Sequence, residues 1–378
     1  MEDDSFDIIV RASNALALIP VNFHKESNRY CSSSRFFLII NIAFYVLVQI
    51  YNQTTNFYVP ALTVSIIIYI IDDHIFFCFN YCLALNGVLH SKAISKFLNL
   101  LRSVHQQNRL QFGGPRYTEL NKTWLVLTSL VLRHVIHCVF HSTVGIISTT
   151  EEMLMEVLCS MLAISGDTYF VLINAILIVL RAELRHVYNL LAHAKPVQVR
   201  QLFKAHMNVL ALMQLFTKCF ATPVLYCVFM LFYDGTQQLF QCYVVMATSH
   251  DDYSVMEVVY YVSWYVPLVA KLIITMHLAA SISELANEAA LSTRHFDDYS
   301  MKNTKLAKQI NKFLLKNLHQ KKKFSAFGFF NIDNSVIYTV FSSIITYLVI
   351  LIQFKQLEND LTHGNSGNET ISAAGGST

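Results

Sequence analysis

The hydrophobic positions of this chain gather in seven long apolar stretches that are separated by more polar segments. These stretches are approximately 36–52, 59–82, 123–147, 154–180, 207–232, 255–282 and 334–354. A helix of about 20 mostly apolar residues is long enough to cross the roughly 30 Å of hydrocarbon in a bilayer. The pattern therefore predicts an all-α, polytopic membrane protein with seven transmembrane helices and the lipid bilayer as its surroundings.

The composition supports a membrane protein. The chain is 54% hydrophobic and only 14% charged, whereas soluble domains carry about 25% charged residues. The N-terminus is acidic, with Glu2, Asp3 and Asp4 before the first basic residue, Arg11. A signal peptide begins with basic residues and continues into an apolar run, so we expect the first span to act as its own insertion signal.

Lys and Arg residues are concentrated in alternate connecting segments. They occur in segments 1–35, 88–122, 181–206 and 283–330 and are absent from the loops near 53–58, 148–153 and 233–254. The positive-inside rule then places the N-terminus in the cytoplasm, and seven spans place the C-terminus outside. A G-protein-coupled receptor has the opposite orientation, so the charge pattern argues against that class.

The cytoplasmic segments are expected to be ordered. Segment Arg181–Lys195 has apolar residues at helical spacing and predicts that the fourth helix continues into the cytosol. Segment Tyr299–Gln320 predicts a basic amphipathic helix, which either packs against other cytoplasmic helices or lies on anionic lipid. The expected organisation is a cytoplasmic segment 1–35, spans one to six with their extensions in 36–282, a cytoplasmic anchor segment 283–333, the last helix 334–354 and an extracellular, disordered tail 355–378.

The last span carries a stripe of polar residues along one helix face. The stripe consists of Thr339, Ser342, Ser343, Thr346 and Gln353. Hydroxyl groups in membrane helices often bond to backbone carbonyls and allow close helix packing. Alternatively, the stripe forms the wall of a water-filled path, and the spacing alone leaves both interpretations open.

The end of this span carries a family signature. Thr346-Tyr347, five apolar residues and Gln353-Phe354 resemble the TYhhhhhQF signature of the last helix in insect gustatory receptors, where h is a hydrophobic residue. The match is complete along the signature. The chain length, the seven spans and the cytoplasmic N-terminus are also similar to that family, which is divergent elsewhere.

The resemblance implies a ligand-gated, non-selective cation channel in the plasma membrane of a sensory neuron. Such receptors detect a small-molecule tastant or contact pheromone and assemble as homo- or hetero-tetramers with other gustatory receptors. The resemblance implies no cofactor, no enzymatic activity and no nucleic-acid partner. It also implies that the last helix lines the pore, with gate residues Thr346, Tyr347, Ile350, Gln353 and Phe354.

Several spans contain ionisable residues, which are costly inside a membrane and usually paired or functional. They are Asp72, Asp73, His74, Arg133, His134, His137, His141, Asp167, Lys218, Lys271 and His277. Three interpretations remain open. Asp72 or Asp73 pairs with Arg133, or some of these groups line an aqueous ligand pocket, or His137 and His141 bind a metal, for which no third ligand is identifiable. For Lys271, pairing or snorkelling is expected.

The outer halves of the predicted spans contain candidate ligand-binding residues. These are Asp72, His137, His141, Tyr226, Tyr260, Tyr261 and Trp264. Aromatic walls with a few polar groups suit a small organic ligand, and the resemblance implies an outward-opening pocket in each subunit. Each aromatic residue alone is equally explained by an interface anchor or by core packing.

The alternative class is a secondary transporter or a multi-span membrane enzyme. We find no phosphate-binding glycine loop, GxSxG or HExxH motif in the sequence. Transporters often contain internal repeats and helices that are broken near the midplane. Seven spans resist division into halves, and Pro223 and Pro267 are the only transporter-like feature.

Overall fold

The computed structural model describes a helical bundle with two small β-hairpins. The described residues are 4–16, 18–24, 26–32, 36–56, 63–115, 120–143, 149–193, 196–248, 253–291, 308 and 323–374. Within these ranges, a number of side chains are also outside the description, including Asp72, Asp73, His141, Tyr260, Trp264 and those after Leu361.

Seven long helices in the described part of the chain each coincide with most of one predicted span. They are α2 (Phe36–Asn56), α3 (Val64–Phe112), α4 (Leu120–Thr143), α5 (Thr150–Ala192), α6 (Pro196–Thr248), α7 (Tyr253–Leu291) and α10 (Ser335–Ala374). Four of them, α5, α6, α7 and α10, are long and apolar enough to cross a membrane, and α2 and α4 contain shorter apolar stretches. The all-α class with several apolar helices is therefore confirmed.

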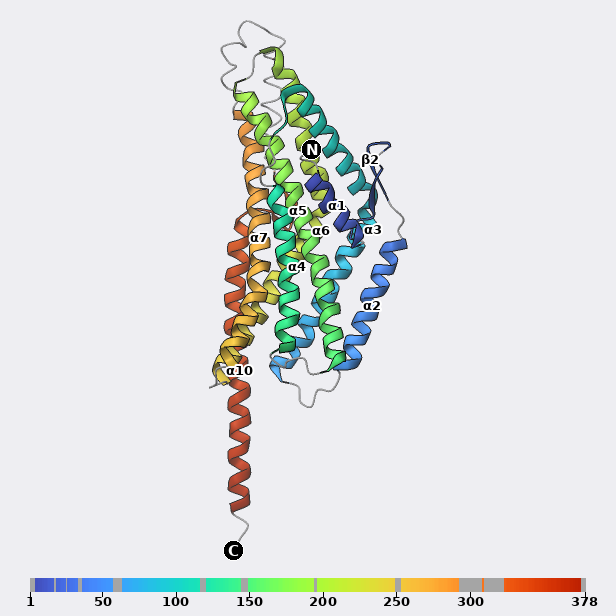
Figure 1. The fold of residues 1–378 in the computed structure, drawn as a ribbon. Coiled ribbons are helices and arrows are strands. Elements are labelled where there is room, and N and C mark those ends of the chain that lie inside the picture. Colours follow the sequence, from blue (N-terminus) through green and yellow to red (C-terminus); the bar gives the residue numbers. More distant parts are fainter. Residues whose placement is uncertain are drawn as a thin grey trace.

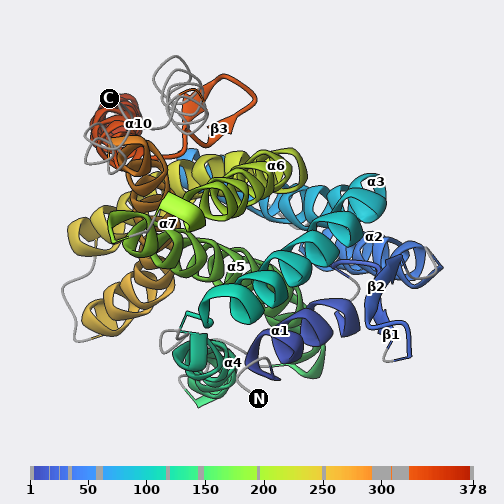
Figure 2. The same ribbon diagram turned by 90° about the horizontal axis from the view of Figure 1, so that it is seen from above.

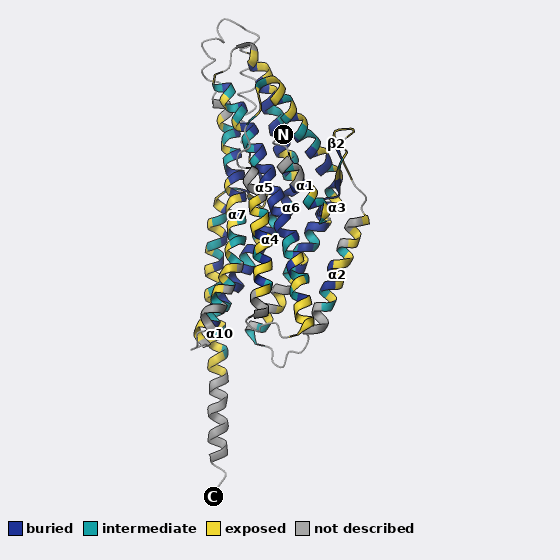
Figure 3. Cartoon of the chain, in the orientation of Figure 1, coloured by how far each residue is buried: buried dark blue, intermediate teal, exposed yellow. Residues whose placement is uncertain are grey.

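The helices form an elongated bundle around α5 (Figures 1 and 2). Viewed from above, α3, α4, α6 and α7 surround α5, whereas α10 lies at the edge beside α6 and α7. Burial follows this arrangement, with the buried residues inside the bundle and exposed residues along α2 and α10 (Figure 3). In the apolar stretch of α5, 78% of the residues are buried, whereas only 17% are buried in the apolar stretch of α10.

The three longest helices of the described chain are much longer than a bilayer is thick. Helices α3, α5 and α6 contain 49, 43 and 53 residues, which corresponds to about 65–80 Å at 1.5 Å per residue. The prediction that the fourth span continues as a helix is confirmed as far as Ala192. Helix α3 continues in the same way to Phe112, so both helices have long extensions beyond their apolar stretches.

Helix α5 is buried on every face along residues 165–177, which is expected for a helix enclosed by neighbours. Ser165 and Thr168 donate to carbonyls of α5 itself, whereas Asn174 and Tyr169 are paired across helices. Thr275 Oγ1 donates to Asn174 Oδ1 at 2.8 Å, and Asn86 Nδ2 approaches the Tyr169 hydroxyl at 2.9 Å. Asn86 Nδ2 also donates to the Cys219 carbonyl at 3.0 Å. These bonds connect α3, α5, α6 and α7 and give the buried polar side chains hydrogen-bond partners, although the Asn86 Oδ1 acceptor has none within the protein.

The N-terminal segment packs against the bundle. Helix α1 (Asp4–Ala15) is followed by the antiparallel hairpin of β1 (Val21–His24) and β2 (Arg29–Ser32). The Tyr30 carbonyl accepts bonds from Ser95 Oγ and Asn99 Nδ2, both at 2.7 Å, which attach the hairpin to α3. A second hairpin, β3 (Ser325–Ala326) and β4 (Phe330–Asn331), precedes α10. The sequence predicted neither hairpin.

Two expectations about the connecting segments were wrong. The segment 233–254 was expected to be a loop, but α6 continues to Thr248 and α7 begins at Tyr253. The tail after residue 354 was expected to be disordered, but α10 continues to Ala374. Lys355 Nζ pairs with Glu358 Oε2 at 2.6 Å one turn later, and no proline interrupts the tail. The amphipathic helix predicted for Tyr299–Gln320 lies outside the described residues apart from Lys308.

Candidate functional site

A cavity of about 500 Å³ lies between α3, α4, α5, α6 and α7. This volume is within the range of about 300–1,000 Å³ that is typical of small-molecule sites. The described lining combines aromatic, thiol, amide and charged side chains. It includes Phe76, Phe79, Asn80, Arg133, His137, Glu156, Cys159, Asp167, Phe170, Cys227, Asp234, Gln237, Gln238, Gln241, Tyr261 and Lys271.

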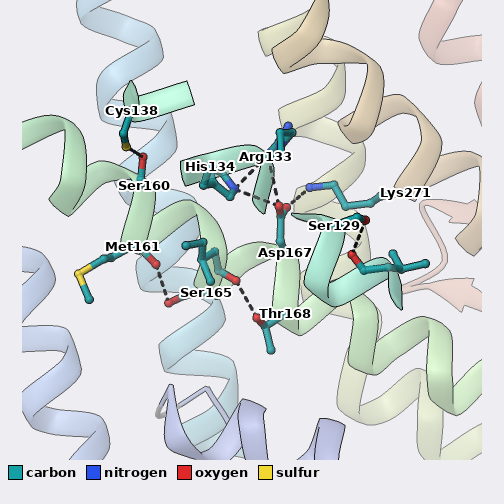
Figure 4. Close-up of polar contacts among 12 residues, drawn as sticks. Ser129, Arg133, His134, Cys138, Ser160, Met161, Ser165, Asp167, Thr168 and Lys271 are labelled. Atoms are coloured by element: carbon teal, nitrogen blue, oxygen red, sulfur yellow. Dashed lines mark hydrogen bonds and ion pairs between the residues drawn. The ribbon is translucent and has the colours of Figure 1, made fainter. Parts of the chain in front are cut away.

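One wall of the cavity is a charge cluster centred on Asp167 of α5 (Figure 4). Its carboxylate pairs with Lys271 of α7 and accepts a bond from Arg133 of α4 at 3.3 Å. His134 Nε2 lies 3.2 Å from the same carboxylate. Asp167 is only 4% exposed, and a buried carboxylate is tolerated where cations and hydrogen bonds compensate its lost hydration. The cluster therefore joins three helices and pairs two cations with one carboxylate.

The structure identifies partners that sequence reasoning left open. The pairing expected for Lys271 is confirmed, with Asp167 as its partner. The Asp72 and Asp73 side chains lie outside the described residues, so the predicted pair with Arg133 stays a prediction. The described partner of Arg133 is Asp167, which is 34 positions further along the chain. Sequence spacing could not have identified this pair because it depends on how α4 packs against α5.

A second polar contact lies in the cavity wall between α4 and α5. His137 Nδ1 is 3.1 Å from Glu156 Oε1, and both residues line the cavity. Among the described residues, no group of three or more His, Cys, Asp or Glu side chains is arranged to hold a metal ion. The wall between α4 and α5 thus contains polar groups that can form hydrogen bonds.

Helix α6 contributes a polar stretch that sequence reasoning missed. Asp234, Gln237, Gln238 and Gln241 all line the cavity, and their spacing of three and four residues places them on one helix face. The neighbouring Gly235 permits α7 to approach, because a Cβ there would lie 2.5 Å from the Tyr265 hydroxyl oxygen. The helical spacing was visible in the sequence, but the segment was interpreted as a loop.

The predicted ligand-binding residues have different outcomes. His137 and Tyr261 line the cavity. Tyr226 is not among the described lining residues, and its ring stacks on Phe79, which does line the cavity, with 5.7 Å between ring centroids. The side chains of Asp72, His141, Tyr260 and Trp264 lie outside the described residues, so their roles stay predictions.

The predicted gate residues lie on α10, where the helix surface is largely exposed. Thr346, Tyr347, Ile350, Gln353 and Phe354 are all exposed within the single chain. Thr346 Oγ1 donates to the Ser342 carbonyl at 2.9 Å, so its hydroxyl is satisfied by its own helix. The ring of Tyr347 packs edge-on against Phe232 of α6, at 5.2 Å between centroids.

Comparison with known proteins agrees with this architecture. The family described as 7tm chemosensory receptor matches residues 6–358. Gustatory and pheromone receptor 39a, isoform B, from Drosophila melanogaster is 34% identical over 124 residues, which are 32% of this chain and 32% of that receptor. Gustatory receptor 68a from the same organism is 60% identical over 50 residues, or 13% of each chain. The alignments thus span a third or less of these relatives.

Solved structures show the same fold. The olfactory receptor OR5 from Machilis hrabei, solved in complex with eugenol, superposes with a TM-score of 0.61 at 11% identity. The superposition covers 92% of this chain and 98% of that one. The apolar helix bundle with an internal cavity is that of a multi-pass membrane receptor. The chain belongs to the 7tm chemosensory receptor family, which consists of receptors and not of enzymes.

Proposed function

We propose that this protein is a gustatory receptor that acts as a ligand-gated cation channel in the plasma membrane of a sensory neuron. The observation that carries the proposal is the position of α10. This helix is apolar enough to cross a membrane, yet only 17% of its apolar stretch is buried. Its exposed surface includes Thr339, Ser342, Thr346 and Gln353, and hydroxyl and amide groups favour water over lipid.

An assembly of four copies around a common axis would resolve this conflict. With α10 nearest the axis, its polar stripe would face a water-filled path, and its apolar sides would contact neighbouring copies. Four copies of Gln353 and Phe354 would then lie close together and close the path by steric blockage and loss of water. The partners in this assembly are identical chains or other gustatory receptors, which gives a homo- or hetero-tetramer.

The proposed orientation places this gate on the extracellular side. Basic residues occur in alternate connecting segments, which favours a cytoplasmic N-terminus and seven spans. The cavity then lies toward the outside, where a dissolved tastant or contact pheromone can enter. The extensions of α3 and α5 would lie in the cytoplasm, together with the N-terminal hairpin and the segment 283–333.

Helix α6 offers a direct mechanical connection between cavity and gate. Asp234 lines the cavity and lies two positions after Phe232, which packs against Tyr347 of α10. Further along, Gln356 Nε2 of α10 lies 3.5 Å from the Tyr243 hydroxyl of α6. A ligand that shifts α6 would therefore displace α10 at two points, which suits a ligand-controlled gate.

The transporter alternative is less well supported. Helix α6 is continuous through Pro223 and α7 is continuous through Pro267. Broken helices at the substrate site are the feature that would favour a transporter, and the two prolines do not produce them.

Whole-cell current in cells that express the chain tests the proposal. We expect a panel of tastants to include compounds that open a cation current. Gln353→Ala and Phe354→Ala should raise the ligand-free current, normalised to surface protein. Ile345→Ala is the matched control, because Ile345 is exposed and lies about a quarter turn from the polar stripe. Normal ligand-free current in both gate variants would mean that the stripe is a packing face.

A further inference from the structure

The chemistry of the cavity wall indicates which class of ligand it accepts. The described lining contains two cations, Arg133 and Lys271, and three carboxylates, Glu156, Asp167 and Asp234. The carboxylates of this wall therefore outnumber its lysine and arginine side chains. Both cations contact the same carboxylate, that of Asp167, so neither is left without a counter-ion.

Among the described residues no cation contacts Asp234 directly, because the Lys271 ammonium acts on it only at longer range and is paired with Asp167. Asp234 is 7% exposed, and none of the ion pairs in the described part of the chain involves it. The bond that the structure gives it is a neutral one, from Gln238 Nε2 to Asp234 Oδ1 at 3.3 Å. A buried carboxylate with one neutral bond remains poorly compensated, and a cationic ligand group would supply the missing charge.

Three amide groups of the cavity wall lack donors for their oxygens. The side-chain oxygens of Asn80, Gln237 and Gln238 are buried and have no hydrogen-bond partner within the protein. All three residues line the cavity and are at least nine-tenths buried. Unmet acceptors inside a protein are costly, and rotation of the terminal amide lets such an oxygen accept a bond from a ligand donor.

Aromatic rings also line this cavity. Phe76, Phe79, Phe170 and Tyr261 line the same cavity, and Phe79 and Phe170 are stacked with 6.3 Å between centroids. Ring faces attract organic ammonium groups and bind apolar ligand bodies. At Asp234 an anion would meet a carboxylate and acceptor oxygens, whereas an ammonium group would meet a counter-ion, acceptors and ring faces.

We propose that the ligand of this cavity is an organic amine, protonated at neutral pH and attached to an aromatic or bulky apolar body, with Asp234 as its counter-ion. Gln237 and Gln238 accept further bonds from the ammonium group or from neighbouring ligand donors. This inference rests on the proposed function only in taking the cavity as the ligand site.

The test is equilibrium binding to the purified full-length receptor in lipid nanodiscs. Three probes share a diphenyl body and differ in the polar group: 3,3-diphenylpropylamine, 3,3-diphenylpropan-1-ol and 3,3-diphenylpropanoate. We expect the amine to bind at least tenfold more tightly than the carboxylate, with the alcohol between them. Asp234→Asn should remove this preference and Asp234→Glu should retain it.

The matched control is Glu151→Gln, which removes one carboxylate from the exposed start of α5 outside the described lining. It should leave all three affinities unchanged. Unaltered alcohol binding in Asp234→Asn shows that this variant is folded. The proposal is overturned if the carboxylate binds as well as the amine, if the preference survives in Asp234→Asn, or if none of the probes binds. Amine binding without any current would support the ligand class and refute the channel.

Discussion

Removal of the Asp167 carboxylate is the most informative perturbation of the bundle itself. Asp167→Asn keeps the side-chain size and deletes the charge that pairs with Lys271 and Arg133. The side chains of these two cations are only 15% and 22% exposed. Removing one partner of a buried pair costs about 3–5 kcal/mol, because the remaining charge is left uncompensated. Two cations share this carboxylate, so we expect a loss at the upper end of that range.

The thermal unfolding midpoint of purified receptor measures this loss. An unfolding entropy of about 2.1 cal/mol/K per residue corresponds to about 1.3 °C per kcal/mol for 378 residues. We therefore expect Asp167→Asn to lower the Tm by at least about 5 °C and to reduce surface expression. The additional change Lys271→Met removes one unpaired cation and should restore part of the loss. A Tm that falls by less than about 1 °C, as for an exposed substitution such as Glu151→Gln, would refute the role of this cluster.

Three further predictions follow from other parts of the structure. Glu183→Gln should lower the Tm by several degrees in the same assay. The fully buried Glu183 carboxylate contacts His105 Nδ1 at 2.8 Å and Asn108 Nδ2 at 2.7 Å, and the substitution disturbs both contacts. An unchanged Tm would contradict this. Tyr347→Ala should reduce the maximal ligand-evoked current without changing ligand affinity, because it removes the contact with Phe232; an equal loss of affinity would place Tyr347 in binding instead. An epitope tag at the N-terminus should stain only permeabilised cells, and surface staining of intact cells would refute the proposed orientation.

The helix pattern was predictable because hydrophobic length is a local property. Each predicted span lies mostly in one long helix, and the extension after the fourth span followed from its apolar spacing. The ends were less predictable, since polar residues can continue a helix when they face a cavity or water. Asp234 and Gln237 illustrate this, because they were assigned to a loop and lie within α6.

The candidate site was only partly predictable, because it depends on which helices meet. His137 and Tyr261 were recognised from residue type and depth, and both line the cavity. The Asp167 cluster joins residues from α4, α5 and α7 that are 34 and 104 positions apart. Such pairs arise from the packing of the bundle, so a single sequence contains no periodic signal for them.

The most direct test of the central claim is a recording from purified receptor in a planar lipid bilayer. The account predicts discrete cation currents that appear when a ligand is added and disappear when it is washed out. In the variant Gln353→Cys, an external thiol reagent should block these currents, and the unmodified receptor should remain conducting under the same reagent. Ligand binding to the same preparation without any unitary current would contradict the claim that this receptor is itself the channel.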